Sequence, residues 1–249
     1  MIPNKIHYCW FGKKKIPSNV VRYIDSWKEH LPNFDIKQWN EENFDVNMFD
    51  YTKEAYFAKK YAFVSDVARL WALVEEGGLY LDTDILVLKP FNPKLWENEA
   101  FVGFEHFKYI GTGVMAAERR HPFFIEFLQR YENMHFFKNI NFDEETNVSR
   151  ITKLFLEKGC IPNNTRQIIA NVKVYEQELF CNKNWKTNQY YNSEKSYTIH
   201  DFQSSWISDY KFFFSGFVNR FSNITTILSY KLFHRYLRNY SKHICNEDH

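Results

Sequence analysis

The chain has 249 residues, 45% of them hydrophobic and 19% aromatic, so it is long and apolar enough to form its own core. Its 32 basic and 30 acidic side chains leave a net charge of +2, which gives no general signal for nucleic-acid binding. The cysteines are far apart and include no C-x-x-C pair, which indicates reduced structural thiols rather than a zinc site or a disulfide framework: Cys9, Cys160, Cys181 and Cys245.

Residues 4–40 predict a β-α-β unit. Strand-forming residues at 4–11 and 34–40 flank a helix at 17–32, with Ser18 as its N-cap. The apolar residues of that helix recur at the spacing of one buried face: Val21, Ile24, Trp27 and Leu31. Because such a crossover joins parallel strands, the unit favours a mostly parallel sheet covered by helices.

A long helix is predicted next, over 52–76, and Gly77 and Gly78 end it before a strand at 79–82. The buried stripe of this helix comprises Phe63, Val67, Leu70, Trp71 and Val74. Further strands are predicted at 100–104, 112–118, 172–180 and 196–202, and further helices at 121–133 and 145–159. The whole pattern predicts one α/β domain over 1–206, followed by a helical tail over 207–249.

Two aspartates, Asp82 and Asp84, stand where the strand at 79–82 ends. If the backbone stays extended there, both carboxylates lie on one face about 6 to 7 Å apart. At an effective dielectric constant near 20, two such charges repel by roughly 3 kcal/mol, which predicts a cation between them. Oxygen ligands suit Mg²⁺ or Mn²⁺, which also bind phosphate, whereas the alternative is a solvated loop.

On the preceding helix, Asp66 and Arg69 are three residues apart and therefore share a face. Taken alone, they are better explained by a surface ion pair worth under about 1 kcal/mol. Taken with the neighbouring segments, they form an ordered set: I-H-x-x-W, S-D-x-x-R and G-G-x-Y-L-D-x-D. This set, over residues 2–93, resembles glycosyltransferase family 32, which includes yeast mannosyltransferases, the catalytic domains of large clostridial toxins and many bacterial polysaccharide enzymes.

The resemblance implies a GT-A fold, a nucleotide-sugar donor, a divalent metal ion and retention of anomeric configuration. By position in the motifs, Asp84 would ligate the metal directly, and Asp82 would contact the donor and support the metal through water. Asp66 and Arg69 would bind hydroxyl groups of the donor sugar. Trp10 would stack on the nucleotide base, although burial in the core is an alternative for this side chain.

Two later segments resemble the family more loosely. In GTGVMAAERRHP, the small residues Gly111, Thr112 and Gly113 would line the sugar cleft, or they would form a turn or bulge. In YTIHDFQSSW, the resemblance implies a lid over the diphosphate, with side chains that complete the metal shell or cover the leaving group: His200, Asp201, Ser204, Ser205 and Trp206. His200 as a metal ligand, which Mn²⁺ accepts, and His200 as a core histidine remain alternatives.

The tail carries basic residues at a spacing of four, three and four, and an aromatic stripe beside them. The basic residues are Lys231, Arg235, Arg238 and Lys242, and the stripe comprises Tyr230, Phe233, Leu237, Tyr240 and Ile244. Such a helix either lies on a membrane surface or packs on the domain with a solvated basic edge. The N-terminus lacks the apolar stretch of a signal peptide and no segment reaches 18 apolar residues, which predicts a cytoplasmic protein, at most bound to the inner face of the cell membrane.

The residues and the resemblance together predict a metal-dependent, retaining hexosyltransferase. It would use Mn²⁺ or Mg²⁺ and a UDP-sugar, and it would act on a saccharide or lipid-linked saccharide in bacterial surface polysaccharide synthesis, with no role for nucleic acid. A transferase that glycosylates a protein and a non-catalytic scaffold that binds sugar nucleotides or membranes are the alternatives. A haloacid dehalogenase-type phosphohydrolase fits less well, because its aspartates belong on the first strand.

Overall fold

In the computed structural model, which describes residues 1–139, 141–184, 187, 189–191, 194–202 and 224–232, the chain begins with the expected β-α-β unit. Strand β1 (Lys5–Cys9) pairs parallel with β2 (Asp35–Trp39), and α1 (Ser18–His30) connects them. The helix buries Ile24, Trp27 and the following Leu31 as predicted. Val21 is 42% exposed, however, and the N-cap is Pro17 rather than Ser18.

The central sheet has seven strands in the order β2-β1-β3-β6-β5-β10-β9. The further strands are β3 (Gly78–Leu81), β5 (Ala100–Glu105), β6 (Tyr109–Ala117), β9 (Gln167–Ile169) and β10 (Val172–Tyr175). The β1–β2, β1–β3 and β5–β10 pairs are parallel, whereas β6 is antiparallel to both β3 and β5, and β9 is antiparallel to β10. The α/β class is confirmed, and the sheet is mixed because β6 returns between two strands of the opposite direction.

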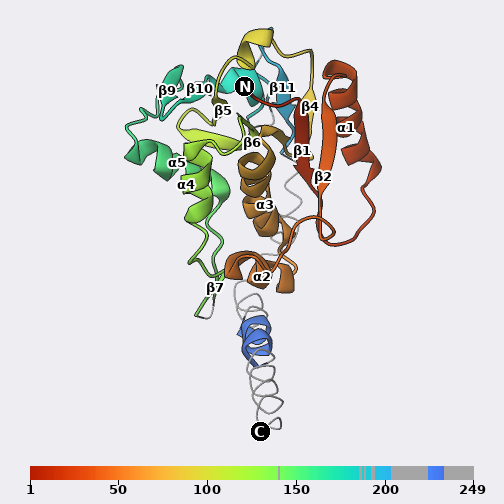
Figure 1. The fold of residues 1–249 in the computed structure, drawn as a ribbon, viewed down its shortest axis with the longest axis vertical. Helices are drawn as coiled ribbons and strands as arrows, with labels where there is room; N and C mark the ends of the chain where they lie inside the picture. The colour runs from red at the N-terminus through yellow and green to blue at the C-terminus, as the bar shows by residue number, and fades with distance from the viewer. Residues whose placement is uncertain (140, 185–186, 188, 192–193, 203–223, 233–249) are drawn as a thin grey trace.

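Helices cover both faces of the sheet, and alternate residues of each strand face the two resulting cores. Leu79 and Leu81 of β3 belong to the core under α1, whereas Tyr80 belongs to the core under α3 (Tyr61–Glu76). The α3 core also contains side chains from α2 (Asp50–Phe57), α4 (Pro122–Gln129) and α5 (Asn147–Glu157). Figure 1 shows α1 and α3 on opposite sides of β1 and β2.

Two short antiparallel pairs complete the domain. Strand β4 (Ile85–Val87) pairs with β11 (Thr198–His200), and β7 (Phe137–Lys138) pairs with β8 (Asn141–Phe142). A 3-10 turn, η1 (Pro93–Leu95), follows β4. The β4–β11 pair matters for function because it brings the late segment at 198–202 beside the D-T-D sequence.

Two predicted elements differ from the structure. The helix predicted over 52–76 is divided at residues 58–60, where Lys59 has a φ of 58° that interrupts the helical backbone. In the second half, Trp71 is only partly buried, and Gly77, with a φ of 66°, ends α3 as expected. The strand predicted over 172–180 ends at Tyr175, and α6 (Gln177–Phe180) follows it.

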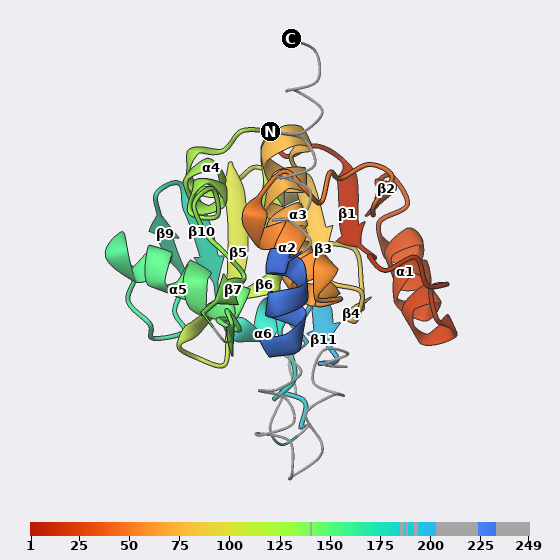
Figure 2. The ribbon, with the colours of Figure 1, turned by 90° about the horizontal axis from the view of Figure 1, so that it is seen from below.

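Of the predicted tail, residues 224–232 are described and are helical, and Figure 2 shows them beside α2 and β7. Ile227 is 2% exposed, and the ring of Tyr230 lies 5.2 Å from Phe57 and 5.0 Å from Phe137. This part of the tail therefore packs on the domain. Lys231 is exposed, as the solvated basic edge requires, whereas the other basic residues and the rest of the aromatic stripe lie outside the described residues, as does the predicted boundary at 206/207. Within the described part of the chain, no helix has the length and apolarity that crossing a membrane requires.

Candidate active site

The site is formed where three strands end at the same edge of the sheet. Because β3 and β5 are both antiparallel to β6, they point the same way, as does β1. Trp10 follows β1, Asp82 follows β3 and Glu105 ends β5. Ligands of open α/β sheets gather beyond the carboxyl ends of strands, so the position of the D-T-D sequence is the expected one.

The D-T-D sequence forms a turn and not an extended strand. The backbone N–H of Ile85 donates to the carbonyl oxygen of Asp82 at 3.0 Å, which joins β3 to β4. The expected separation of about 6 to 7 Å is therefore wrong, since the turn brings a carboxylate oxygen of Asp82 and one of Asp84 within 4.8 Å of each other. The cations next to these carboxylates are side chains of the protein, Arg69 for Asp82 and His200 for Asp84.

Arg69 is the centre of a buried network. Its side chain is 7% exposed, and its Nη1 lies 3.2 Å from a carboxylate oxygen of Asp82 and donates to the carbonyl oxygen of Thr112 at 3.1 Å. The hydroxyl of Tyr80 donates a hydrogen bond to Asp82 Oδ1 at a distance of 2.9 Å. Burial opposes the charge of Arg69, but the carboxylate of Asp82 offsets it and raises the pKa of the guanidinium further. Asp82 is thereby held in one orientation.

Asp66 is the second carboxylate of this network, 3.1 Å from Nη2 of Arg69 and 13% exposed. The two side chains share a face of α3, as predicted, but their burial rules out the alternative of a surface ion pair. Burial raises the pKa of Asp66 to about 6, although Arg69 acts in the opposite direction. Asp66 is therefore a carboxyl group that is easily protonated, beside a guanidinium that stays charged.

His200 ends β11, and the pairing of His200 with Ile85 across the β4–β11 ladder places the imidazole beside the D-T-D turn. Its Nε2 lies 3.3 Å from Asp84 Oδ1. Burial lowers the pKa of His200, but Asp84 more than offsets it, so the pKa lies well above its ordinary value. Asp201, the alternative ligand, is bound elsewhere: Tyr23 donates to one of its oxygens at 2.5 Å and Lys183 to the other at 2.5 Å.

The small residues of β6 form the floor of the site. A Cβ at Gly113 would lie 3.2 Å from both Asp82 Oδ2 and His200 Cε1, and one at Gly111 would lie 3.2 Å from Glu105 Oε2. Thr112 is 4% exposed and its carbonyl oxygen accepts from Arg69. These three residues belong to β6, in the stretch between Ile110 and Met115 where its register with β5 is irregular, so the alternative of a bulge is confirmed and that of a turn is not.

Trp10 lies at the same edge and is partly buried, packed against the core under α1. Its indole N–H donates to the carbonyl oxygen of Lys14 at 2.7 Å, which fixes the ring plane. The predicted lid residues Ser204, Ser205 and Trp206 lie outside the described residues. The structure thus brings together Asp82, Asp84 and His200 on one side, and Asp66, Arg69 and Thr112 on the other.

The donor atoms at this edge fit a divalent cation. Asp82, Asp84 and His200 each offer one ligand atom, and these three atoms all lie within 4.8 Å of one another. Two carboxylate oxygens and one imidazole nitrogen are a donor set that Mn²⁺ accepts. A D-x-D motif implies divalent metal binding of the kind typical of sugar transferases, and the geometry agrees with it.

Several residues of the site were not predicted from the sequence. Tyr80 orients Asp82, Glu105 faces His200 at 3.9 Å, and Cys181 follows α6 beside them. Glu105 directly follows the strand predicted at 100–104, but the sequence does not show that this strand ends at the same edge of the sheet as β3. No sequence pattern predicts Cys181 as a site residue, because its position depends on α6, and the sequence predicts a strand over those residues.

Comparison with known proteins agrees with this geometry. Residues 17–102 match the family described as "Glycosyltransferase sugar-binding region containing DXD motif". The chain is 27% identical over 242 residues to an uncharacterized glycosyltransferase, L373, of Acanthamoeba polyphaga mimivirus, covering 89% of this chain and 90% of that protein. It is 26% identical over 128 residues to "Subversion of eukaryotic traffic protein A" of Legionella pneumophila, but the match covers only 20% of that protein and 41% of this chain.

A third relative, named "Toxin", from Photorhabdus asymbiotica, is 30% identical over 126 residues, which are 36% of this chain and 4% of that protein. Among solved structures, the PaToxG glycosyltransferase is 21% identical with a TM-score of 0.45, covering 64% of this chain and 69% of that one. The galactosyltransferase LgtC, solved with donor and acceptor sugar analogues, is 14% identical with a TM-score of 0.40, covering 70% and 74%. Both TM-scores are below 0.5, so the likeness of the coordinates is partial. Residues 17–102 form a glycosyltransferase sugar-binding region with a DXD motif, and the chain is a glycosyltransferase.

Proposed function

We propose that this glycosyltransferase moves a sugar from a UDP-sugar with the help of Mn²⁺ and with retention of anomeric configuration. The observation that carries the proposal is the convergence of Asp82, Asp84 and His200 within 4.8 Å of one another, at the carboxyl edge of the sheet. Asp84 and His200 would hold the cation directly. Asp82, which Arg69 and Tyr80 already hold, would contact the donor and support the cation through water.

The bound cation would act as a Lewis acid that stabilises the negative charge on the leaving diphosphate. The protein's own residues would position the donor. Asp66 would accept a hydrogen bond from a sugar hydroxyl, and Arg69, held by Asp66 and Asp82, would fix the orientation of both carboxylates. Trp10 would stack on the base, and Gly111 and Thr112 would allow the sugar to approach β6 closely.

This arrangement needs no carboxylic acid to protonate the leaving group, because charge on a diphosphate is stabilised by a cation. Asp82 is also held too firmly to act as a nucleophile, since Tyr80 and Arg69 both bind its carboxylate. We therefore favour same-face substitution through an oxocarbenium-like state over a covalent intermediate. Ser205 and Trp206 remain the candidates for covering the diphosphate.

For the acceptor, we favour a protein over a bacterial surface saccharide. The support comes from two relatives, one named as a toxin and one named for subverting eukaryotic traffic, which match about two fifths of this chain. The surface-polysaccharide role that was predicted from the sequence has less support from the comparisons. A cytoplasmic location of the enzyme, and its binding to a membrane through the tail, remain predictions.

Hydrolysis of the donor without an acceptor tests the metal and the donor together. UDP- and GDP-sugars are incubated with the purified chain, with and without Mn²⁺, and release of the nucleotide is measured. We expect release from a UDP-sugar that depends on Mn²⁺ and falls at least about 100-fold in Asp84→Asn, as for the loss of one electrostatic contact to a transition state. Asp25→Asn, on the exposed side of α1, is the control. Metal-independent turnover that survives Asp84→Asn would refute the proposal.

The acceptor is tested with the labelled donor identified in that screen. Label is followed into proteins of a eukaryotic cell extract and, in parallel, into free and lipid-linked oligosaccharides. We expect label in protein that Asp84→Asn abolishes. Label found only in the saccharides would favour the surface-polysaccharide role instead, without affecting the donor and metal assignment.

A further inference from the structure

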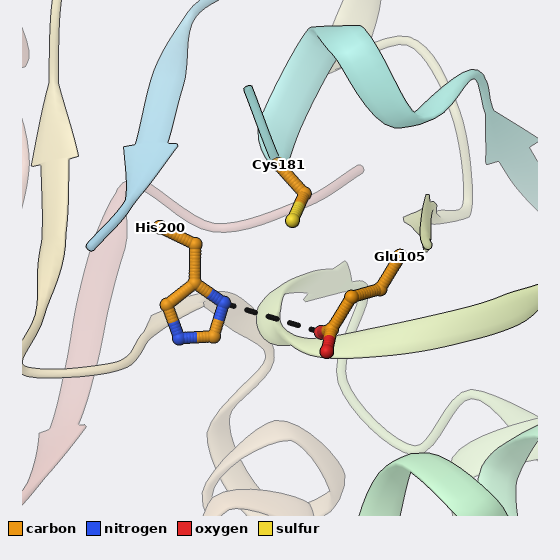
Figure 3. A group of neighbouring side chains, drawn as sticks. All are labelled: Glu105, Cys181 and His200. Atoms are coloured by element: carbon orange, nitrogen blue, oxygen red, sulfur yellow. Dashed lines mark ion pairs between the residues drawn. The ribbon is translucent and has the colours of Figure 1, made fainter. Parts of the chain in front are cut away.

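A second cluster of metal-ligating side chains lies next to the D-T-D turn and uses the other nitrogen of His200. Glu105, at the end of β5, and Cys181, directly after α6, converge on His200, and one ligand atom from each lies within 4.8 Å of the others. Figure 3 shows the sulfur of Cys181 pointing into the gap between the imidazole and the carboxylate. The ion pair drawn there joins His200 Nδ1 to Glu105 Oε2 at 3.9 Å.

The three side chains line a recess of about 230 Å³, including the solvent at its mouth. Gly103, Gly111 and Gly113 form part of its wall, and their missing side chains let Phe180, Glu105 and His200 lie close to the strands. The enclosed part of the recess has room for about one ion or water molecule, so any further ligand of an ion would come from the solvent at the mouth. Catalytic zinc sites usually have three protein ligands and an open fourth position, whereas structural sites have four protein ligands.

The charges of the cluster also suit a divalent ion. One thiolate, one carboxylate and one neutral imidazole around a dication give a net charge of zero, which removes the penalty for burying unpaired charge. Within the described residues, the nearest cationic group to the Glu105 carboxylate is His200, at 3.9 Å. The Cys181 side chain is hydrogen-bonded to His200 and makes a weak contact to the carbonyl oxygen of Lys183, at 4.0 Å. An ion between the three side chains would replace these contacts by bonds to each of them.

We propose that Glu105, Cys181 and His200 form a site for a thiophilic divalent ion such as Zn²⁺, and that this ion competes with the D-x-D cation for His200. Sulfur ligands select zinc over magnesium and manganese. Binding releases two protons to solvent, the thiol proton of Cys181 and the Nδ1 proton of the His200 imidazolium, and the ion takes the sulfur and Nδ1 in their place. Cys181 is a free, buried thiol, as expected, but its sulfur faces a histidine and a carboxylate from two other elements, which is the basis for assigning it a further role.

The competition follows from the tautomers of one imidazole. A neutral ring carries one N–H, so only one of its nitrogens can bind a metal. When the D-x-D cation binds Nε2, the proton lies on Nδ1 and points to Glu105. When the thiophilic ion binds Nδ1, the proton lies on Nε2 and is donated to Asp84, 3.3 Å away. Each ion thus excludes the other from His200, and Zn²⁺ is expected to inhibit the Mn²⁺-dependent reaction.

The site is tested by titrating the metal-free chain with Co²⁺, which replaces Zn²⁺ and is visible in the absorption spectrum. We expect a sulfur-to-cobalt charge-transfer band in the near ultraviolet, with the intense visible bands of four-coordinate cobalt, at one ion per chain. Cys181→Ser and Cys181→Ala should lack the charge-transfer band, whereas Cys160→Ser, which alters another buried free thiol, should retain it. Thermal unfolding of each variant shows whether it is folded.

Competition is measured separately from the free Mn²⁺ signal in electron paramagnetic resonance, with no donor present. Zn²⁺ should raise the apparent dissociation constant for Mn²⁺ in the parent chain, and Cys181→Ser should need at least about 100-fold more Zn²⁺ for the same effect, because losing even an outer-shell partner costs about 10- to 100-fold. The absence of the cobalt band, or its persistence in a folded Cys181→Ser variant, would overturn the site. Independent binding of Zn²⁺ and Mn²⁺ would overturn the competition. Neither result depends on the transferase reaction.

Discussion

Asp82 and Asp84 are two residues apart, yet the protein holds them in different ways. On what we call the Arg69 side, Asp82 shares a buried network with Asp66, Arg69 and Tyr80, whose contacts measure 2.9 to 3.2 Å. On the His200 side, Asp84 faces His200 at 3.3 Å, and Glu105 lies 3.9 Å beyond. The carboxylates of the first side are bound by a guanidinium, which cannot ligate a metal, whereas the second side offers an imidazole, which can, so an added cation belongs on the His200 side.

The two sides rest on different parts of the fold. Arg69 lies on a 16-residue helix that packs on the central sheet, whereas His200 lies on a three-residue strand that pairs only with β4 among the described elements. We therefore expect changes on the Arg69 side to act on stability, and changes on the His200 side to act on metal affinity.

Replacement of Arg69 should have the largest effect. Arg69→Met keeps the length of the side chain but leaves two buried carboxylates, Asp66 and Asp82, without their cation. We expect the free energy of unfolding to fall by about 3 to 5 kcal/mol, as for other broken buried ion pairs. Arg130→Met, which removes exposed ion pairs with Glu126 and Glu157, should change it by no more than about 1 kcal/mol. Denaturant unfolding measures the change in the free energy of unfolding for both variants. If the two changes were equal, the Arg69 network would not contribute specially to stability.

Replacement of Asp66 should alter how stability depends on pH. Its pKa is about 6 in the folded chain against an ordinary 3.8, so the folded state binds the proton more tightly. The free energy of unfolding of the parent chain should therefore fall as the pH rises from about 4 to 6, by up to about 3 kcal/mol at 1.36 kcal/mol per pKa unit.

Asp66→Asn should lack this contribution, so the two unfolding free energies should converge or cross as the pH is lowered. Asp25→Asn, which removes an exposed carboxylate, controls for the loss of one negative charge. Parallel pH profiles for the parent chain and Asp66→Asn would mean that Arg69 neutralises both of its carboxylates fully.

The sequence revealed the two sides to different extents. The Arg69 side was found almost entirely, because Asp66, Arg69 and Asp82 lie within 17 consecutive residues and their order is a motif. Tyr80 was missed although it lies inside that motif, since a tyrosine in a strand is ordinarily core and its hydroxyl partner depends on the turn after β3.

The His200 side was found only in part, because it depends on contacts between segments far apart in the chain. His200 is 116 residues from Asp84, and only the β4–β11 pairing brings its Nε2 to Asp84. To predict Glu105, one must know that β6 lies between β3 and β5, because this order makes β3 and β5 end at the same edge of the sheet. The interruption of the predicted helix at residues 58–60 could not be seen in the sequence, because Lys59 has a positive φ there and the segment contains no glycine or proline to mark it.

Removal of the His200 imidazole should lower metal affinity more than stability. We expect His200→Ala to raise the dissociation constant for Mn²⁺ by about 10- to 100-fold, equivalent to about 1.4 to 2.8 kcal/mol. His135→Ala, which removes a 57% exposed imidazole beside Glu54, should leave it unchanged. Free Mn²⁺ measured by electron paramagnetic resonance gives both constants. An unchanged constant in His200→Ala would mean that Asp82 and Asp84 hold the cation without the imidazole.

The smallest expected effect distinguishes the two nitrogens of His200 through the floor beneath them. A Cβ at Gly113 would lie 3.2 Å from Asp82 Oδ2 and His200 Cε1 and 3.3 Å from His200 Nδ1, so it would move the carboxylate and the whole imidazole by a few tenths of an ångström. A Cβ at Gly111 would press on Glu105 instead, at 3.2 Å from Oε2. Gly113→Ala should therefore weaken Mn²⁺ binding about fivefold to tenfold, equivalent to about 1 to 1.4 kcal/mol, whereas Gly111→Ala should weaken Co²⁺ binding and leave Mn²⁺ binding nearly unchanged. If both variants weakened the binding of Mn²⁺ and of Co²⁺ equally, each glycine would affect both metal sites. The assignment of Mn²⁺ to Nε2 and of Co²⁺ to Nδ1 would then fail.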